Sequence, residues 1–200
     1  MTTFVTSDLH FNHLRILQYC PERSGPETSW DKVAVMNDTI IRNWNECVAP
    51  EDETYIIGDV AMGLIEKAPP LIRSLNGKKF LIRGNHDKTL VKLIAADTEM
   101  EHADLFEWIK DYHEMTFKFA GEKRMLVMSH FPMAFWHRQA QGSIMLHGHL
   151  HGSYCGVKGR IKDIGIDTNK LRPYRMEDVV REMLKIEVRE SHHEGDNHGE

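Results

Sequence analysis

The chain has few cysteines and no long apolar run. Only three cysteines, Cys20, Cys47 and Cys155, occur in 200 residues, and no two of them form a CxxC pair. This usage argues against a disulfide framework and a thiolate zinc site, and it suits a reducing compartment. No apolar run is long enough to cross a bilayer, and residues 1–10 lack the basic start and apolar stretch of a signal peptide. We therefore expect a cytoplasmic protein without a membrane span.

The sequence also lacks a strong charge of either sign. The net charge is −5, and basic residues cluster only at 78–79 and 158–162. Without a long basic stripe, we do not expect the protein to bind duplex nucleic acid. The length fits one domain with a substantial core. We expect this domain over residues 1–190, followed by a disordered, polar, histidine-containing tail over residues 191–200.

The order of expected elements indicates the fold class. Helices alternate with strands in the first half of the chain, and strands dominate the second half. This order predicts an α/β layered fold with a mixed sheet or two facing sheets. The expected helices are 29–48, capped by Ser29 or Asp31, then 64–75, 88–96 and 175–185. The expected strands are 2–7, 54–59, 78–85, consecutive antiparallel strands within 106–130, then 143–149 and 159–167.

Histidine is abundant, with thirteen in all, and three of them alternate in LHGHLHG, residues 146–152. Other polar side chains collect where expected strands end. In open α/β sheets, ligands bind outside the carboxyl ends of strands. Each motif alone is a weak signal, but five in this arrangement are hard to obtain by chance. The residues at these ends are Asp8, His10, Asp59, Asn85, His86, Asp87, His130, His149 and His151.

The donor chemistry of these side chains suits metal ions. Carboxylate, amide and imidazole groups without a thiolate favour Mn²⁺, Fe²⁺, Zn²⁺ or Ni²⁺. Seven such ligands are too many for one ion and suit two, and a carboxylate can bridge them. In an extended segment alternate side chains point to the same side, so His149 and His151 can reach neighbouring ions. We expect His147 to point away and to pack or support the ligands.

The motifs DLH, GDV, GNHD, SHF and GHLH follow one another in this order. Their series resembles the calcineurin-like metallophosphoesterases, whose pattern is D-x-H, G-D, G-N-H-[DE], H and G-H-x-H. The opening SDLHFNH looks most like the small, single-domain bacterial and phage members. The resemblance implies a four-layer α/β/β/α sandwich of two facing mixed sheets, with the active site at the carboxyl ends of strands.

The resemblance also implies a role for each motif residue. Two divalent ions, with Mn²⁺ the first candidate, would lower the pKa of a shared water so that hydroxide forms near neutral pH. His86 would be the catalytic histidine beside the scissile phosphate, with Asp87 orienting it and Asn85 also contacting that phosphate. One metal would be held by Asp8, His10 and His151, the other by Asn85, His130 and His149, with Asp59 bridging both.

Departures from the pattern bear on the substrate. Protein phosphatases of this superfamily carry GDxVDRG and GNHE, whereas this chain has GDVAMG and GNHD and lacks the phosphate-clamping arginine. The resemblance therefore favours a phosphodiesterase acting on small or cyclic nucleotides, with an open pocket because no large cap insertion is visible. A phosphomonoesterase, including a protein phosphatase, and a non-catalytic scaffold that binds protein partners remain alternatives. The oligomeric state is left open.

Four further residues are candidates for contacting the substrate. Asn12 and His13 follow the first motif, and a helix cap and a surface histidine are equally good interpretations. Arg83 is near enough to contribute charge, or is solvated. The segment HFPMAFWHRQ offers a base-stacking wall, although we expect at least two of its three aromatic side chains to pack in the core. The residues concerned in this segment are Phe131, Phe135, Trp136 and Arg138.

Overall fold

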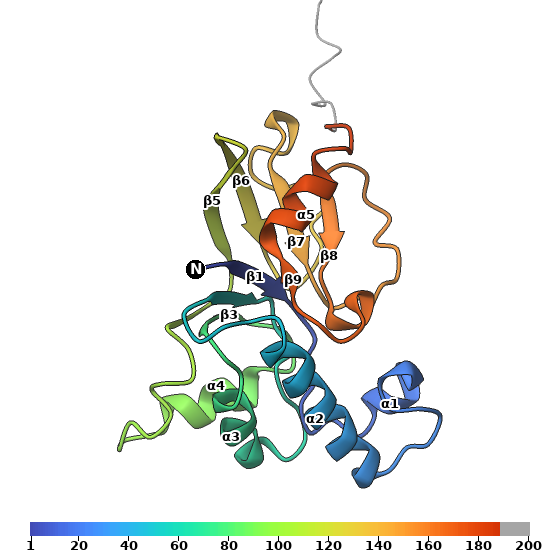
Figure 1. Cartoon of the computed structure of the whole chain (residues 1–200), viewed down its shortest axis with the longest axis vertical. Helices are drawn as coiled ribbons and strands as arrows, with labels where there is room; N and C mark the ends of the chain where they lie inside the picture. Colours follow the sequence, from blue (N-terminus) through green and yellow to red (C-terminus); the bar gives the residue numbers. More distant parts are fainter. Residues whose placement is uncertain (189–200) are drawn as a thin grey trace, which may run out of the picture.

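The computed structural model describes residues 1–188 and contains two β-sheets with helices packed on them (Figure 1). The first sheet has the strand order β4-β3-β2-β1-β9, and the second has the order β5-β6-β7-β8. The predicted α/β class with two mixed sheets is therefore confirmed. The tail predicted over 191–200 lies outside the described residues.

The first sheet takes four strands from the first 110 residues, mainly the N-terminal half of the chain, and one short strand from the C-terminal half. Strands β1 to β4 are parallel, and β9 pairs antiparallel with β1. Helices α2, α3 and α4 cover one face of this sheet (Figure 1). The strands are β1 (Thr3–Thr6), β2 (Glu53–Ile56), β3 (Lys78–Ile82), β4 (Trp108–Lys110) and β9 (Tyr174–Arg175). The helices of this half are α1 (Ile16–Tyr19), η1 (Pro21–Arg23), α2 (Trp30–Asn45), η2 (Ile65–Lys67), α3 (Ala68–Arg73) and α4 (Lys88–Ala95).

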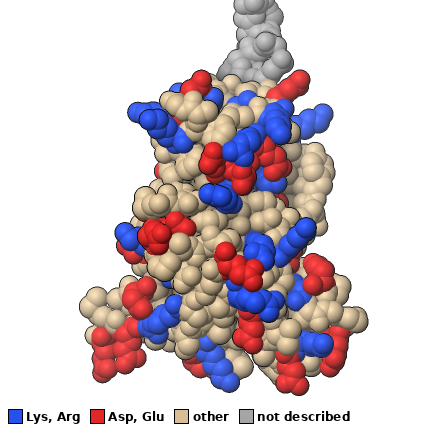
Figure 2. Space-filling model, viewed as in Figure 1, with Lys and Arg blue, Asp and Glu red and all other residues tan. Residues whose placement is uncertain are grey.

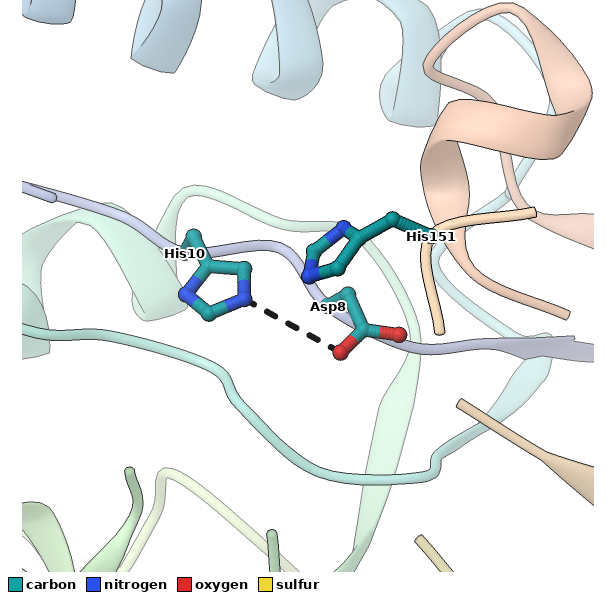
Figure 3. A group of neighbouring side chains, drawn as sticks. All are labelled: Asp8, His10 and His151. Atoms are coloured by element: carbon teal, nitrogen blue, oxygen red, sulfur yellow. Dashed lines mark ion pairs between the residues drawn. The ribbon is translucent and has the colours of Figure 1, made fainter. Parts of the chain in front are cut away.

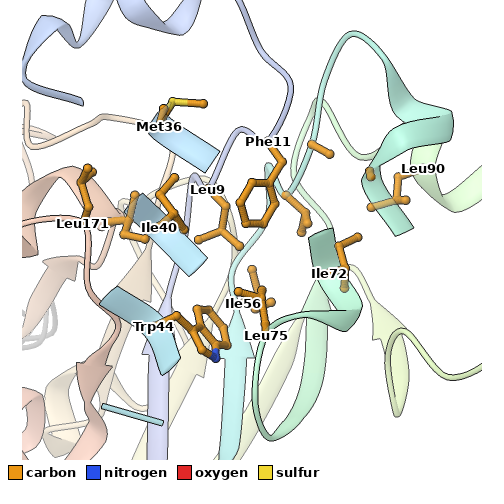
Figure 4. Close-up of a cluster of buried hydrophobic side chains, with 14 of the residues drawn as sticks. Leu9, Phe11, Met36, Ile40, Trp44, Ile56, Ile72, Leu75, Leu90 and Leu171 are labelled. Atoms are coloured by element: carbon orange, nitrogen blue, oxygen red, sulfur yellow. The ribbon is translucent and has the colours of Figure 1, made fainter. Parts of the chain in front are cut away.

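Helix α2 shows how the sequence builds this layer. The Ser29 hydroxyl accepts a hydrogen bond from the backbone N–H of Lys32 at 3.3 Å, which confirms Ser29 as the cap. Met36, Ile40 and Trp44 recur at helical spacing and are fully buried against the sheet and its neighbouring helices (Figure 4). The predicted helix 64–75 divides at residue 68, where Pro69 and Pro70 occupy the first turn of α3. Proline is tolerated there because first-turn N–H groups have no partner within the helix.

The second sheet consists of an antiparallel hairpin followed by two parallel strands. Its strands are β5 (His113–Phe119), β6 (Glu122–Met128), β7 (Ile144–His147) and β8 (Ile161–Asp163). One face packs on the first sheet and on α5 (Met176–Met183), and these residues form a common apolar cluster. The opposite face carries Val127 and Met145, which Trp136 covers. This covering segment contains one 3-10 helix, η3 (Gln139–Gln141), and no α-helix among the described residues.

Two predictions about strands were wrong. Residues 108–110 form β4, a parallel edge strand of the first sheet, instead of the first strand of an antiparallel series. Strand β9 was not predicted, because two residues are too short to show a periodicity. The remaining strands lie where predicted but end earlier, so the motif residues belong to the loops that follow. The short helix η4 (Ile166–Asn169) also replaces the end of the predicted strand 159–167.

The surface and the cysteines agree with the composition. Lysine and arginine side chains alternate with acidic ones over the face shown in Figure 2, without a continuous basic stripe on that face. All three cysteines are free. Among residues 1–188, no helix has the length and apolar character that crossing a membrane requires.

Candidate metal centre and active site

The motif residues gather beyond the ends of β1, β2, β3, β6 and β7, and several have unusual backbone conformations. Asp8, His10, Asp59, His149 and His151 have φ values of 59°, 52°, 55°, 73° and 47°. Non-glycine residues pay about 1–3 kcal/mol for such a conformation, and these conformations concentrate at functional sites. The backbone at this edge is therefore held in a strained form that directs polar side chains to one place.

Two glycines make the close approach of these loops feasible. A Cβ atom added at Gly148 would lie 1.7 Å from the Ser7 hydroxyl oxygen and 2.5 Å from Asp8 Oδ2. One added at Gly84 would lie 2.2 Å from Asp59 Oδ1. Because real Cβ atoms never come so close, only glycine admits the two carboxylates at these positions. This explains physically why GH and GNH begin with glycine in this chain.

One group of metal-binding side chains, the buried triad, comprises Asp8, His10 and His151 (Figure 3). One ligand atom of each lies within 4.8 Å of the others. His10 Nε2 lies 3.9 Å from Asp8 Oδ1 and has no hydrogen-bond partner, although it is buried. Buried polar atoms are normally satisfied, so this unpartnered nitrogen has the character of a metal ligand. The residues present therefore fit a metal ion.

A second group, the open triad, comprises Asp59, His130 and His149. His130 Nδ1 lies 2.8 Å from the Ile57 carbonyl oxygen, to which it can donate, leaving the Nε2 lone pair for a ligand. This Nε2 lies 3.0 Å from Asn85 Oδ1. Two lone pairs facing each other at this distance repel unless a cation or proton lies between them. The open triad with Asn85 therefore also fits a cation.

Asp59 connects the two triads. Its Oδ2 atom lies 3.7 Å from His10 Nε2 and 3.5 Å from His130 Nε2. Asp59 is 2% exposed, so water does not screen it from these rings. The oxygen therefore faces one imidazole from each triad, and the two triads together with Asn85 comprise the seven residues that the resemblance assigns as metal ligands.

The titration of these groups reflects their burial. Burial raises the pKa of Asp8 to about 6 and lowers the pKa of His10 well below its usual value. Burial also tends to raise the pKa of Asp59, but the neighbouring His130 outweighs burial and lowers the pKa of Asp59. His149 also has a lowered pKa, through burial and the neighbouring His130. Neutral His10 and His149 are in the protonation state that a metal ligand needs.

Two residues that the sequence did not reveal support the buried triad. Asp167 accepts a hydrogen bond of 2.7 Å from His151 Nδ1, which directs Nε2 of that ring away from Asp167. Arg23 donates to both oxygens of Asp167 at 2.6 Å and to the Asp8 carbonyl at 2.7 Å. The side chains of Arg23 and Asp167 are 0% and 4% exposed. Burial works against protonation of His151, but Asp167 outweighs it and raises the pKa of His151 to about 10.

His86 lies at the mouth of the centre. Its backbone N–H donates to Asp59 Oδ1 at 2.9 Å, and its Nε2 lies 3.9 Å from Asp59 Oδ2. The imidazole is 34% exposed, so a substrate can reach it. His13 lies beside it with a ring separation of 5.8 Å, and His13 Nδ1 is 3.1 Å from His10 Nδ1. His13 is therefore placed to orient the His10 ring, and it lies next to the accessible His86.

Asp87 and Asn12 contact the protein backbone. The Asp87 carboxylate accepts hydrogen bonds from the N–H groups of Asp59, Val60 and Gly84, at 2.9, 2.8 and 2.8 Å. It thereby ties the GDV loop to the GNHD loop, and any orienting effect on His86 acts through this connection. The Asn12 side chain bonds to Asn37 and to the Leu64 carbonyl. These contacts favour the structural interpretation of Asn12.

The other candidates for substrate contact lie in different environments. Arg83 pairs with Asp111 and lines a cavity next to the open triad. Arg138 is exposed, and no hydrogen bond or ion pair within residues 1–188 links its side chain to either triad.

The expectation that at least two of the three aromatic side chains of segment 130–139 pack in the core was wrong. Trp136 is buried, whereas Phe131 and Phe135 are 49% and 60% exposed. Phe131 lies 4.7 Å from His149, ring to ring.

His147 points to a different part of the fold, as predicted. It is 2% exposed, its Nδ1 lies 2.8 Å from the Gly148 carbonyl oxygen, and it belongs to neither triad.

Comparison with known protein families shows which family the chain belongs to. The model of the calcineurin-like phosphoesterase family matches residues 1–185. The chain belongs to this family. As a calcineurin-like phosphoesterase, it is a member of a family of metal-dependent phosphoester hydrolases, and the resemblance inferred from the motifs is confirmed.

The calcineurin-like chain is similar to several small proteins. It is 28% identical to the uncharacterized protein MJ1445 of Methanocaldococcus jannaschii, over 92% of this chain and 93% of that protein. It is also 28% identical to the gene 66 protein of Mycobacterium phage L5, over 74% of this chain and 77% of the phage protein. The crystal structure of the protein of unknown function AQ665 from Aquifex aeolicus is similar in fold. Its TM-score is 0.62 at 20% identity, covering 90% of this chain and 98% of that one.

Proposed function

We propose that this protein is a dinuclear metal-dependent phosphodiesterase that acts on small nucleotides. The observation that carries the proposal is the position of Asp59, whose Oδ2 atom lies within 3.7 Å of an imidazole from each triad. An oxygen shared by two ligand groups supports a pair of ions over a single one. The mixed oxygen and nitrogen donors favour Mn²⁺, with Fe²⁺, Zn²⁺ and Ni²⁺ as alternatives.

The ions would supply Lewis acidity and a hydroxide nucleophile near neutral pH. Asp8, His10 and His151 would hold one ion, and Asn85, His130 and His149 the other, with Asp59 between them. Arg23 and Asp167 keep the His151 ring and the Asp8 backbone in place, so the buried triad needs little rearrangement to bind.

His86 is the residue placed to handle the leaving group. Its imidazole is accessible and close to Asp59, so a phosphate bound between the triads lies within its reach. A protonated His86 Nε2 can donate its proton to the departing oxygen, which makes His86 the general acid. Asn85 and His86 also supply polar groups that offset charge on the phosphate oxygens.

The choice of a diester rests on the GDVAMG loop. The phosphate-clamping arginine of protein phosphatases is absent from it, and Gly63 packs closely on the Asn12 carbonyl, leaving no space for a side chain. This loop therefore presents no cation to hold a doubly charged monoester. The exposed Phe131 ring beside His149 can stack on a nucleobase. We also predict a cytoplasmic location.

A substrate panel with Mn²⁺ tests the proposal. It contains phosphomonoesters, a phosphopeptide, 2′,3′- and 3′,5′-cyclic nucleotides, dinucleotides and single-stranded oligonucleotides. We expect a nucleotide diester to have the highest kcat/KM. Faster turnover of the phosphopeptide than of every diester would reverse the choice of substrate class. Absence of bound transition metal together with no activation by Mn²⁺ would overturn the enzyme assignment.

A further inference from the structure

A cavity of about 440 Å³, here called the side pocket, adjoins the open triad. Asn85 and His130 form part of its wall, so it opens directly beside the metal centre. No residue of the buried triad lines it, and Asp59 does not line it either. A phosphate held between the triads therefore lies next to the side pocket and not inside it.

The charged side chains of the side pocket are Arg83, Lys88 and Asp111. Two cations face a single carboxylate. Arg83 pairs with Asp111, but the two side chains are 41% and 72% exposed. An exposed ion pair contributes little to stability, so Arg83 can exchange this partner for a bound anion at little cost.

Lys88 occupies a position that its own helix disfavours. It is the first residue of α4, whose first turn contains no acidic residue. A helix N-terminus carries a partial positive charge, so a lysine there is repelled unless an anion is present. The Asp87 carboxylate does not cap this end, because it binds the backbone of the neighbouring loops. Within residues 1–188, no carboxylate pairs with Lys88.

Ser129 adds an independent indication of a ligand. This residue is 8% exposed and lines the side pocket, and its hydroxyl makes no hydrogen bond within the described residues. The hydroxyl oxygen itself is accessible, so it can reach a ligand in the side pocket. A hydroxyl left unpartnered in the wall of a cationic cavity is a donor available to an anion.

We propose that the side pocket binds a second phosphate group of the substrate, separate from the scissile one. The pocket would thereby select phosphodiesters that also carry a terminal phosphate. Arg83 and Lys88 supply the charge, the Ser129 hydroxyl supplies a hydrogen bond, and Phe131 at the edge of the pocket faces the nucleoside. This inference rests on the proposed diesterase function and names its substrate class more narrowly.

The kinetic test compares the dinucleotide ApA with and without a 5′-phosphate, in the full chain loaded with Mn²⁺. We expect the phosphorylated form to have a KM lower by about fivefold to tenfold, as one charge-assisted contact provides. Arg83→Gln and Lys88→Gln should each remove most of this preference. Lys92→Gln, an exposed lysine one turn further along α4, is the matched control and should retain it.

The Asp111→Asn variant distinguishes a binding role from a structural one. If Arg83 serves the second phosphate, removing its competing carboxylate should lower the KM for the phosphorylated dinucleotide, opposite in sign to Arg83→Gln. If the Arg83–Asp111 pair is only structural, both variants should change KM in the same direction, which would overturn the proposal. Equal KM values for the two dinucleotides in the wild-type protein would overturn it as well.

Equilibrium binding separates this inference from the proposed function. Calorimetric titration with adenosine 3′,5′-bisphosphate and with AMP needs no turnover. Tighter binding of the bisphosphate, lost in Arg83→Gln, would support the side pocket even if no diester were hydrolysed. Equal binding of the two nucleotides would refute the side pocket while leaving diesterase activity intact.

Discussion

The two triads of the metal centre are built differently. Each contains two residues that are at most 2% exposed, Asp8 and His10 in one and Asp59 and His130 in the other. The difference lies in the third residue and its surroundings, because His151 of the buried triad is fixed by the buried Asp167–Arg23 pair. The open triad has a partly exposed His149, an exposed Phe131 beside it and the side pocket next to it. We infer a division of labour, in which the buried triad holds its ion rigidly and the open triad meets the substrate.

Asp59 lies between the two triads, so its substitution should have the largest effect on the metal centre. Asp59→Asn replaces the shared anionic oxygen by a neutral group, which bridges two cations poorly. We expect both ions to bind more weakly and activity to fall by more than about a hundredfold, since loss of a supporting residue alone costs about 10–100-fold. Elemental analysis and Mn²⁺ titration measure the effect, with Asp104→Asn, in the exposed pair with Arg73, as the control carboxylate. Loss of one ion alone would show that Asp59 belongs to a single triad.

Much of the centre was readable from the sequence because its residues follow buried strands directly. Asp8, Asp59 and Asn85 come from parallel neighbours β1, β2 and β3, whose carboxyl ends necessarily meet. The His149 and His151 motif follows β7 in the second sheet, and its alternation was visible as a pattern. The strand ends therefore indicate the candidate metal ligands, while their division into two groups comes from the family resemblance.

Arg23 and Asp167 could not be found in this way. They are 144 residues apart, and neither lies in a motif. Their pairing depends on how η1 and η4 are placed against the end of β1, which is a matter of tertiary packing. The wrong prediction that at least two aromatic side chains of segment 130–139 pack in the core has the same origin, because the exposure of Phe131 and Phe135 depends on how the segment crosses the second sheet. The sequence indicates local secondary structure, but it does not reveal how segments far apart in the chain pack against one another.

The His86→Asn variant tests whether His86, at the mouth of the centre, acts as the general acid. His86→Asn keeps a polar group but cannot protonate the leaving oxygen. Because general acid catalysis contributes about 10²–10⁴-fold, a nucleotide diester with an alkoxide leaving group should lose that much kcat/KM. A nitrophenyl ester, whose leaving group needs no proton, should lose far less. An equal loss for both substrates would make His86 a phosphate-binding residue, and metal content should be unchanged in either case.

Asp167→Asn sharpens the comparison by disturbing the buried triad alone. The His151 ring would lose its anionic acceptor and keep at most a weaker amide acceptor, so the ion held by Asp8, His10 and His151 should bind about 10–100-fold more weakly. The ion at the open triad should be unaffected. The protein should also melt at a lower temperature, because Arg23 is left buried without its anion.

The control for Asp167→Asn is Asp104→Asn, which breaks the exposed pair with Arg73. It should change neither metal affinity. Competitive Mn²⁺ titration, analysed for two sites, separates the ions. Equal weakening of both sites in Asp167→Asn would contradict the independence of the two triads.

The smallest expected effect is a proton released when the buried triad binds its ion. A metal binds neutral imidazole, whereas the pKa of His151 is raised to about 10 by Asp167 against the opposing effect of burial. At pH 8 the ring therefore carries a proton that Mn²⁺ must displace, and affinity at this triad should rise with pH up to about 10. In Asp167→Asn the chief cause of the raised pKa is gone, so about one proton fewer should be released per chain. Calorimetry in two buffers of different ionisation enthalpy measures this number, and identical release in both proteins would show that Asp167 does not control His151.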